Sequence, residues 1–179
     1  VMLHAGGAVG AETYTLPAQA PAPPVTFEQW VDQVAMLATP ISAAEMKLWS
    51  PGWKVTACGS DMDPGIHQHQ YGRDLVLVLH PVSETVPGAI EANLAIPAGA
   101  KQLVATVASH QGQELYDYVL RIFVNGGKIA EETIATAGKW KDVTADISKW
   151  AGTTAHVRVE NAANGWNFEA AYIGSISIE

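Results

Sequence analysis

The sequence predicts an all-β protein, an antiparallel β-sandwich of the jelly-roll type, with a short helical segment and an extended proline-rich arm at its N-terminus. From residue 49 onward, short apolar or alternating segments recur with turn residues between them, as in sandwiches whose strands return roughly every 8–12 residues. Helical spacing is confined to residues 26–48. The length of 179 residues and the hydrophobic content of 48% are sufficient for one buried core.

The N-terminal part divides into an arm, residues 1–25, and a helical segment, residues 26–48. The arm is rich in Ala, Gly and Pro, and each proline removes a backbone donor, so we expect an extended chain. Five apolar residues follow helical spacing: Phe27, Trp30, Val31, Val34 and Leu37. This spacing predicts an amphipathic helix over 26–38. Ser42 and Glu45 have the spacing of a capping box, which predicts a second short helix from Ser42 to Leu48.

Residues 49–179 are predicted to form the β-sandwich domain. The apolar and alternating segments predict strands at 53–58, 75–79, 90–96, 103–109, 118–124, 128–134, 140–147 and 155–160, followed by a closing strand. Residues 75–79 are apolar on both faces, which is typical of a central strand. Asn125-Gly126 predicts a tight hairpin turn, whereas residues 59–73 are predicted to be a long loop.

The closing strand is predicted from alternation that begins at Phe168. One alternate set is mainly apolar and predicts the buried face: Phe168, Ala170, Tyr172, Gly174, Ile176 and Ile178. The preceding turn, residues 161–169, is rich in asparagine and presents Trp166 after Gly165. The sequence therefore predicts a sheet strand preceded by a loop that carries an aromatic ring, an acid and several amides.

The composition excludes some classes of function. A net charge of -8 disfavours nucleic-acid binding, and no apolar run is long enough for a membrane span. The motifs of common hydrolases, metalloproteases and nucleotide-binding enzymes do not occur, so we expect no enzymatic activity. The lone Cys58 is expected to be a buried apolar side chain. The small residues 8–11 are similar to the end of a secretory signal, which favours an extracellular or periplasmic protein.

A series of motifs between residues 50 and 178 carries a family resemblance. The motifs are the strand 75–79 with His80-Pro81, the strand 90–96 with Pro97, the strand and turn 117–126, the segment 140–147, Trp150-Ala151-Gly152 and the final Glu169-Ala170-Ala171-Tyr172-Ile173. Their order resembles the galactose-binding-like jelly rolls, especially the NPCBM-type carbohydrate-binding modules of bacterial secreted proteins. The chain departs from that pattern with Glu169 where the family favours Asp, and with Tyr172 where it favours Trp.

The resemblance implies a non-catalytic carbohydrate-binding module whose partner is a glycan or polysaccharide. An aromatic ring can pack against the C–H face of a sugar, while amides and acids bond its hydroxyl groups. The predicted ligand-binding residues are Trp166, Asn164, Asn161, Glu169 and Tyr71. This site requires the loop 61–74 to fold beside the turn 161–169.

Two alternatives stay open. The carboxylates of Asp61 and Asp63 and the imidazoles of His67 and His69 have spacings that suit a metal ion, and the resemblance implies a structural calcium near Asp61, Asp63 and Glu169. In the other alternative the chain is an assembly subunit. Residues 1–38 would then clasp a neighbouring chain and form a homo-oligomer or a larger assembly.

Overall fold

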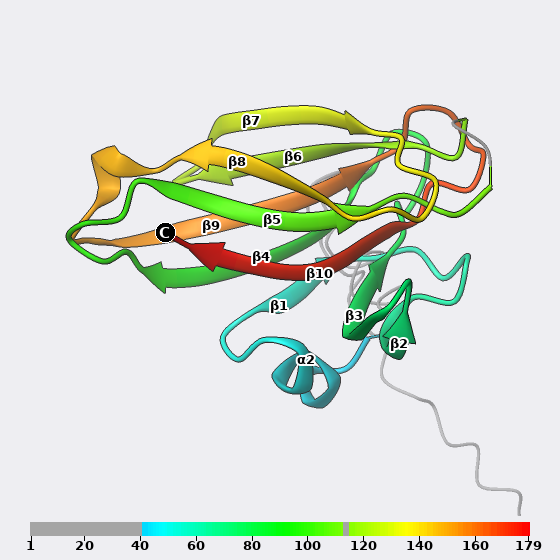
Figure 1. The fold of residues 1–179 in the computed structure, drawn as a ribbon, viewed down its shortest axis with the longest axis horizontal. Helices are drawn as coiled ribbons and strands as arrows, with labels where there is room; N and C mark the ends of the chain where they lie inside the picture. Colours follow the sequence, from blue (N-terminus) through cyan, green and yellow to red (C-terminus); the bar gives the residue numbers. More distant parts are fainter. Residues whose placement is uncertain (1–40, 113–114) are drawn as a thin grey trace, which may run out of the picture.

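The computed structural model describes residues 41–112 and 115–179 as a sandwich of two five-stranded sheets (Figure 1). Every strand pairing is antiparallel, and most neighbours in a sheet are distant in the sequence. The predicted antiparallel β-sandwich is therefore confirmed. The predicted arm 1–25 and helix 26–38 lie outside the described residues, so assembly through residues 1–38 stays a prediction.

The two sheets contain ten strands. The first sheet has the order β1 (Lys54–Ala57), β4 (Gly88–Ala95), β9 (Thr154–Ala162), β6 (Tyr118–Val124) and β7 (Gly127–Ile134). The second has the order β2 (Gly65–Gln70), β3 (Arg73–Leu79), β10 (Ala171–Ile178), β5 (Gln102–Ala108) and β8 (Lys141–Asp146). A 3₁₀ turn, η1 (Ser148–Trp150), follows β8.

Burial along the strands explains the apolar patterns of the sequence. In β3, Leu77 and Leu79 face the main core between the sheets, whereas Val76 and Val78 pack in a second cluster with Tyr172. This strand is therefore apolar on both faces, as predicted. In β6 the buried and partly exposed residues alternate strictly. Asn125 and Gly126 have φ values of 49° and 80°, which suits the tight hairpin turn predicted between β6 and β7.

The predicted capping box is also present. The side chain of Glu45 accepts the Ser42 N–H at 2.7 Å, and the Ser42 hydroxyl accepts the Glu45 N–H at 3.2 Å. These bonds start the helix α2 (Ala43–Trp49), whose Trp49 indole N–H donates to the carbonyl of Ile173 at 3.2 Å. No helix of the described ranges is long and apolar enough to span a membrane.

The prediction of a long loop over residues 59–73 is wrong, because it contains the strand β2. Ile66 is the one large apolar residue of this strand, and its other side chains are mostly histidine and glutamine. β2 lies at the edge of its sheet and pairs with β3 alone. An edge strand with polar side chains on both faces has no alternation of apolar and polar residues. For this reason the sequence pattern did not reveal it.

The predicted phase of the closing strand is wrong for its first half and right for Ile176 and Ile178, which pack against the main core. Strand β10 begins at Ala171, and its core residues are Ala171 and Ile173, followed after a register shift by Ile176 and Ile178. The shift lies between Ile173 and Ser175 and adds one residue opposite β5. Because such a bulge reverses the side-chain alternation, Tyr172 joins the outer cluster instead of the main core. Phe168 precedes the strand and is exposed.

Asn161 joins the two sheets at one end of the sandwich. Its side chain lies in the core, fully buried, and its amide N–H groups donate to the carbonyls of Leu79 and Glu169, each at 2.8 Å. Asn161 belongs to β9 of the first sheet, whereas Leu79 ends β3 of the second sheet and Glu169 precedes β10. One side chain therefore fixes where three chain segments meet.

We predict that Asn161→Ala destabilises the protein by about 2–4 kcal/mol, because it leaves two buried carbonyls without donors. The measurement is the free energy of unfolding from urea denaturation. Asn93→Ala is the matched control, since Asn93 is an exposed asparagine on β4 and should cost less than about 0.5 kcal/mol. Equal stability of the two variants would contradict the role given to Asn161.

Candidate functional site

Loops gather at one end of the sandwich, where strands β3, β5, β7 and β9 finish (right-hand end of Figure 1). The segment between β5 and β6 and the segment between β9 and β10 carry most of the aromatic side chains at this end. Trp166 and Phe168 are 46% and 44% exposed, which is unusual for rings of this size in a well-packed domain. This end is therefore the first candidate for a binding surface.

The rings form what we call the loop-end cluster, which consists of His110, Tyr116, Trp166 and Phe168. The imidazole of His110 is stacked on Phe168 with ring centres 5.0 Å apart and planes 15° apart. Tyr116 packs against the same phenyl ring at 4.3 Å. Trp166 lies two residues from Phe168 in the chain and rests edge-on against the buried His80, with ring centres 5.3 Å apart. The exposed rings are thus supported by neighbours from other loops.

A chain of contacts holds His110 in place. Its Nδ1 is 2.8 Å from the Tyr172 hydroxyl, and Tyr172 packs against Tyr71 with ring centres 4.8 Å apart. The Tyr71 hydroxyl accepts the N–H of Gln111 at 3.0 Å, which ties the β2–β3 turn to the segment that carries His110. Burial lowers the pKa of His110 and raises that of Tyr172. Both groups are therefore favoured in their neutral forms at neutral pH.

Glu169 organises the loop that carries Trp166. The residue is only 1% exposed, and its carboxylate accepts the backbone N–H of Asn164 at 2.9 Å and that of Asn167 at 3.4 Å. Burial raises the pKa of this carboxyl, and the charge of Asp117 raises it further, while the two N–H groups and His80 act in the opposite direction. The loop from Asn164 to Asn167 therefore wraps around a buried acid.

Asp117 and Asn164 connect the two segments that carry the aromatic rings. The side-chain amide of Asn164 donates to Oδ2 of Asp117 at 2.8 Å. Asp117 directly follows Tyr116, and Asn164 lies two residues before Trp166. A carboxylate and an amide are thus held beside the cluster, with polar atoms of the kind that bond sugar hydroxyls.

The predicted ligand-binding residues divide into two groups. Trp166 and Asn164 are exposed at the loop end, and half-buried Tyr71 reaches the cluster through Tyr172. Asn161 and Glu169 are buried beneath the loop, where they position the backbone. The structure therefore brings the five predicted residues to one end of the sandwich, in two layers.

The predicted metal residues lie in separate pairs. His67 Nε2 is 2.9 Å from the carbonyl oxygen of Asp63, and His69 Nδ1 is 2.8 Å from Oδ1 of Asp74. The carboxylate of Asp61 accepts the N–H of Met62 within its own turn. Among the described residues, no three His, Cys, Asp or Glu side chains converge in a way that could hold a metal ion. A structural calcium stays a prediction that the described geometry does not support.

Sequence reasoning did not assign His110, Tyr116 and Phe168 to the site. His110 and Tyr116 are more than 50 positions before Phe168, and only the strand order brings them together. The alternation of apolar and polar residues predicts that Phe168 is buried, because the bulge in β10 is not visible in that pattern. The signal available was weaker: aromatic residues occur in the segments just after two predicted strands, 103–109 and 155–160.

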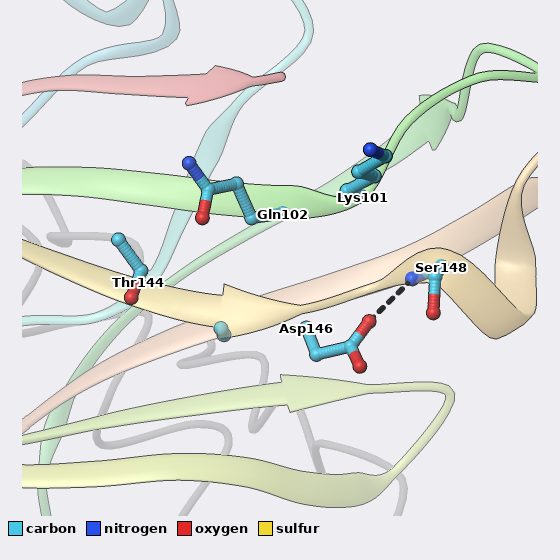
Figure 2. A pocket seen from close by; sticks show the side chains of 6 residues that line it. Lys101, Gln102, Thr144, Asp146 and Ser148 are labelled. Atoms are coloured by element: carbon cyan, nitrogen blue, oxygen red, sulfur yellow. Dashed lines mark hydrogen bonds between the residues drawn. The ribbon is translucent and has the colours of Figure 1, made fainter.

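A concave surface lies at the opposite end of the sandwich, where β8 finishes (left in Figure 1, close-up in Figure 2). This hollow has a volume of about 460 Å³ and is lined by Lys101, Gln102, Thr144, Ala145, Asp146 and Ser148. Asp146 accepts the backbone N–H of Ser148 at 2.8 Å, which fixes the start of η1. No aromatic ring lines this hollow. In an adjoining hollow of about 270 Å³, the Lys149 ammonium lies 4.0 Å from the ring centre of Trp150.

No protein-family model matches the chain, and no curated protein matches it. Among solved structures, a CBM35 from Paenibacillus barcinonensis superposes with a TM-score of 0.51 at 18% identity, over 73% of this chain and 94% of that one. The chain has the fold of this module. The predicted resemblance to galactose-binding-like jelly rolls is thus confirmed for the fold.

Two further structures are similar. A family 35 carbohydrate binding module from an environmental isolate has a TM-score of 0.47 at 20% identity, over 65% of this chain and 82% of that one. The CBM22-1 xylan-binding domain from Paenibacillus barcinonensis has a TM-score of 0.49 at 15% identity, over 73% of this chain and 86% of that one. The conclusion about the fold rests on the first structure alone.

We predict that the stability difference between the natural protein and Glu169→Gln depends on pH. Because the pKa of Glu169 is raised in the folded state, the folded protein binds this proton more tightly than the unfolded chain. The stability contributed by the acid is then present below its unfolded pKa, near 4.3, and is lost as the pH rises through the folded pKa. Urea denaturation should show that the free energy of unfolding of the natural protein, relative to that of the variant, is larger at pH 4 than at pH 7. A difference that does not change with pH would contradict this.

Proposed function

We propose that the chain is a non-catalytic carbohydrate-binding module and that the loop-end cluster is its sugar site. The observation that carries this proposal is the pair of exposed rings, Trp166 and Phe168, held in place by packing and by a buried acid. Exposed aromatic side chains on a supported loop offer flat apolar faces, and such faces suit the C–H side of a sugar ring. The shared fold with a CBM35 is consistent with this function.

In the proposed complex, the sugar ring packs on Trp166 or Phe168, and its hydroxyls bond the polar groups beside them. Asp117 can accept a hydroxyl hydrogen, while Asn164 and Asn167 offer amide groups. Because Glu169 already orders the backbone of the loop, binding costs little conformational entropy.

Several features favour a binding role over catalysis. Of the two acids at the cluster, Glu169 is buried under the loop and Asp117 holds Asn164. Cys58 is buried in the core beside the backbone of His80, and burial raises the pKa of its thiol to about 11, so the reactive thiolate is disfavoured. Export from the cell is part of the same proposal, because glycan polymers are abundant outside cells and residues 8–11 are similar to the end of a secretory signal.

We predict that Trp166→Ala and Phe168→Ala each weaken glycan binding about tenfold or more, because each removes a stacking face. A glycan array identifies a bound sugar, and titration calorimetry with that sugar measures the change. Both variants should stay folded, with a loss of stability of about 1–2 kcal/mol, because about half of each ring packs against neighbouring rings.

The matched control is Leu48→Ala, which removes an exposed apolar side chain on α2, away from the loops. This variant should bind like the natural protein. If no glycan binds the natural protein more strongly than both ring variants, the proposed function is wrong.

A further inference from the structure

We propose that the loop-end site takes neutral or amine-bearing sugars and rejects acidic ones, and that Asp117 is the residue that sets this selection. The inference rests on the proposed function and goes further, because it names the chemical class of the ligand. It follows from the charges that surround the loop-end cluster.

Asp117 is held between the two segments that carry the exposed rings. Its neighbour Tyr116 packs on Phe168 at 4.3 Å, and its own carboxylate accepts the amide of Asn164, two residues before Trp166. Among the described residues this is the one hydrogen bond recorded for that carboxylate, so its remaining acceptor positions are open to a ligand. A sugar stacked on the cluster therefore lies beside a fixed negative charge.

A second carboxylate lies beneath the same loop. Glu169 is buried below Asn164 and Asn167, and the charge of Asp117 is one cause of its raised pKa. Asn164 links the two acids, because its backbone N–H donates to Glu169 and its side-chain amide donates to Asp117. Asp117 therefore contributes a negative potential where the sugar would bind, and Glu169 adds to it when it is ionised.

The described residues place no lysine or arginine in an ion pair with either acid. Arg73 lies over the ring of Trp140 at 5.1 Å, and Lys139 belongs to the neighbouring β7–β8 loop, whose Gly138 N–H donates to the carbonyl of Ser109, but neither cation pairs with Asp117 or Glu169. The imidazole of His80 is buried behind Trp166, with its Nδ1 2.9 Å from the carbonyl oxygen of Pro81. The local balance of charge near the rings is therefore acidic.

An acidic sugar would carry its carboxylate into this environment without a cation to pair with it. Like charges a few ångströms apart at a protein surface lower affinity, whereas an ammonium group in the same place is attracted. Such an unfavourable charge contact discriminates against the uronate even when its ring stacks on the aromatic side chains as well as that of a neutral sugar. The expected order of affinity is amino sugar, then neutral sugar, then uronate.

The experiment compares methyl galactoside, galactosamine and galacturonate, and the corresponding sugars of the gluco series, by titration calorimetry or NMR. We expect the uronate to bind at least about tenfold more weakly than its neutral partner at low salt. The difference should shrink in 1 M salt, where the screening length falls to about 3 Å. Asp117→Asn should bring the affinity for the uronate to within about threefold of that for the neutral sugar, and the measured quantity is this ratio, because Asp117 also contributes to the site that both sugars use.

Two variants complete the test. Asp146→Asn is the matched control, because Asp146 also accepts a hydrogen bond but ends β8, at the opposite end of the sandwich, and this variant should leave the ratio of neutral-sugar to uronate affinity unchanged. Asn167→Lys places a cation on the loop beside Trp166 and should strengthen binding of the uronate, even if Asp117→Asn fails to fold.

The outcomes separate this inference from the proposed function. If neutral sugars bind and uronates bind equally or more tightly, the inference is overturned while the sugar site stands. If the ratio of neutral-sugar to uronate affinity is unchanged in both Asp117→Asn and Asn167→Lys, the role of Asp117 is overturned. If no sugar of either series binds, and none binds on the glycan array, the proposed function itself fails.

Discussion

The side-chain amide of Asn161 is the interaction on which the loop end depends. A buried amide that donates to two carbonyls leaves little freedom to the segments that carry them. One of those segments ends β3 and the other leads into β10, so the amide sets the distance between the two sheets where the loops begin. The position of the loop that carries Trp166 and Phe168 therefore depends on a contact inside the core.

Outward from this amide the site is built in layers of decreasing burial. The carbonyl of Glu169 is fixed by Asn161, and the carboxylate of Glu169 then fixes the backbone that presents Trp166. On the other side, Tyr172 holds His110, which supports Phe168. The rings of Trp166 and Phe168 are thus exposed, but each is held by a contact to a more deeply buried neighbour. This arrangement gives a surface site the precision that loops alone rarely provide.

The sequence was sufficient to predict the sandwich, because apolar alternation and turn residues are local signals. The short helix was predicted because Ser42 and Glu45 cap it within a single turn. The missed features have a common cause: each depends on how strands pair with one another, and the local sequence does not show that pairing. β2 is a strand only because β3 lies beside it, and the phase of β10 depends on a bulge against β5. Likewise, the turn around Trp166 is enough to predict that this ring is exposed. Its neighbour His80 and the partners of Phe168 come from segments that follow other strands, so their contacts could not be predicted.

The polar character of β2 has a further consequence for the behaviour of the protein in solution. This strand ends its sheet and offers unpaired backbone groups to any other extended chain. Its histidines and glutamines, and the charged Lys128, Glu131 and Glu132 on the edge strand β7, make such pairing unfavourable. Copies of the protein at high local density are therefore less prone to join sheet to sheet through β2 or β7.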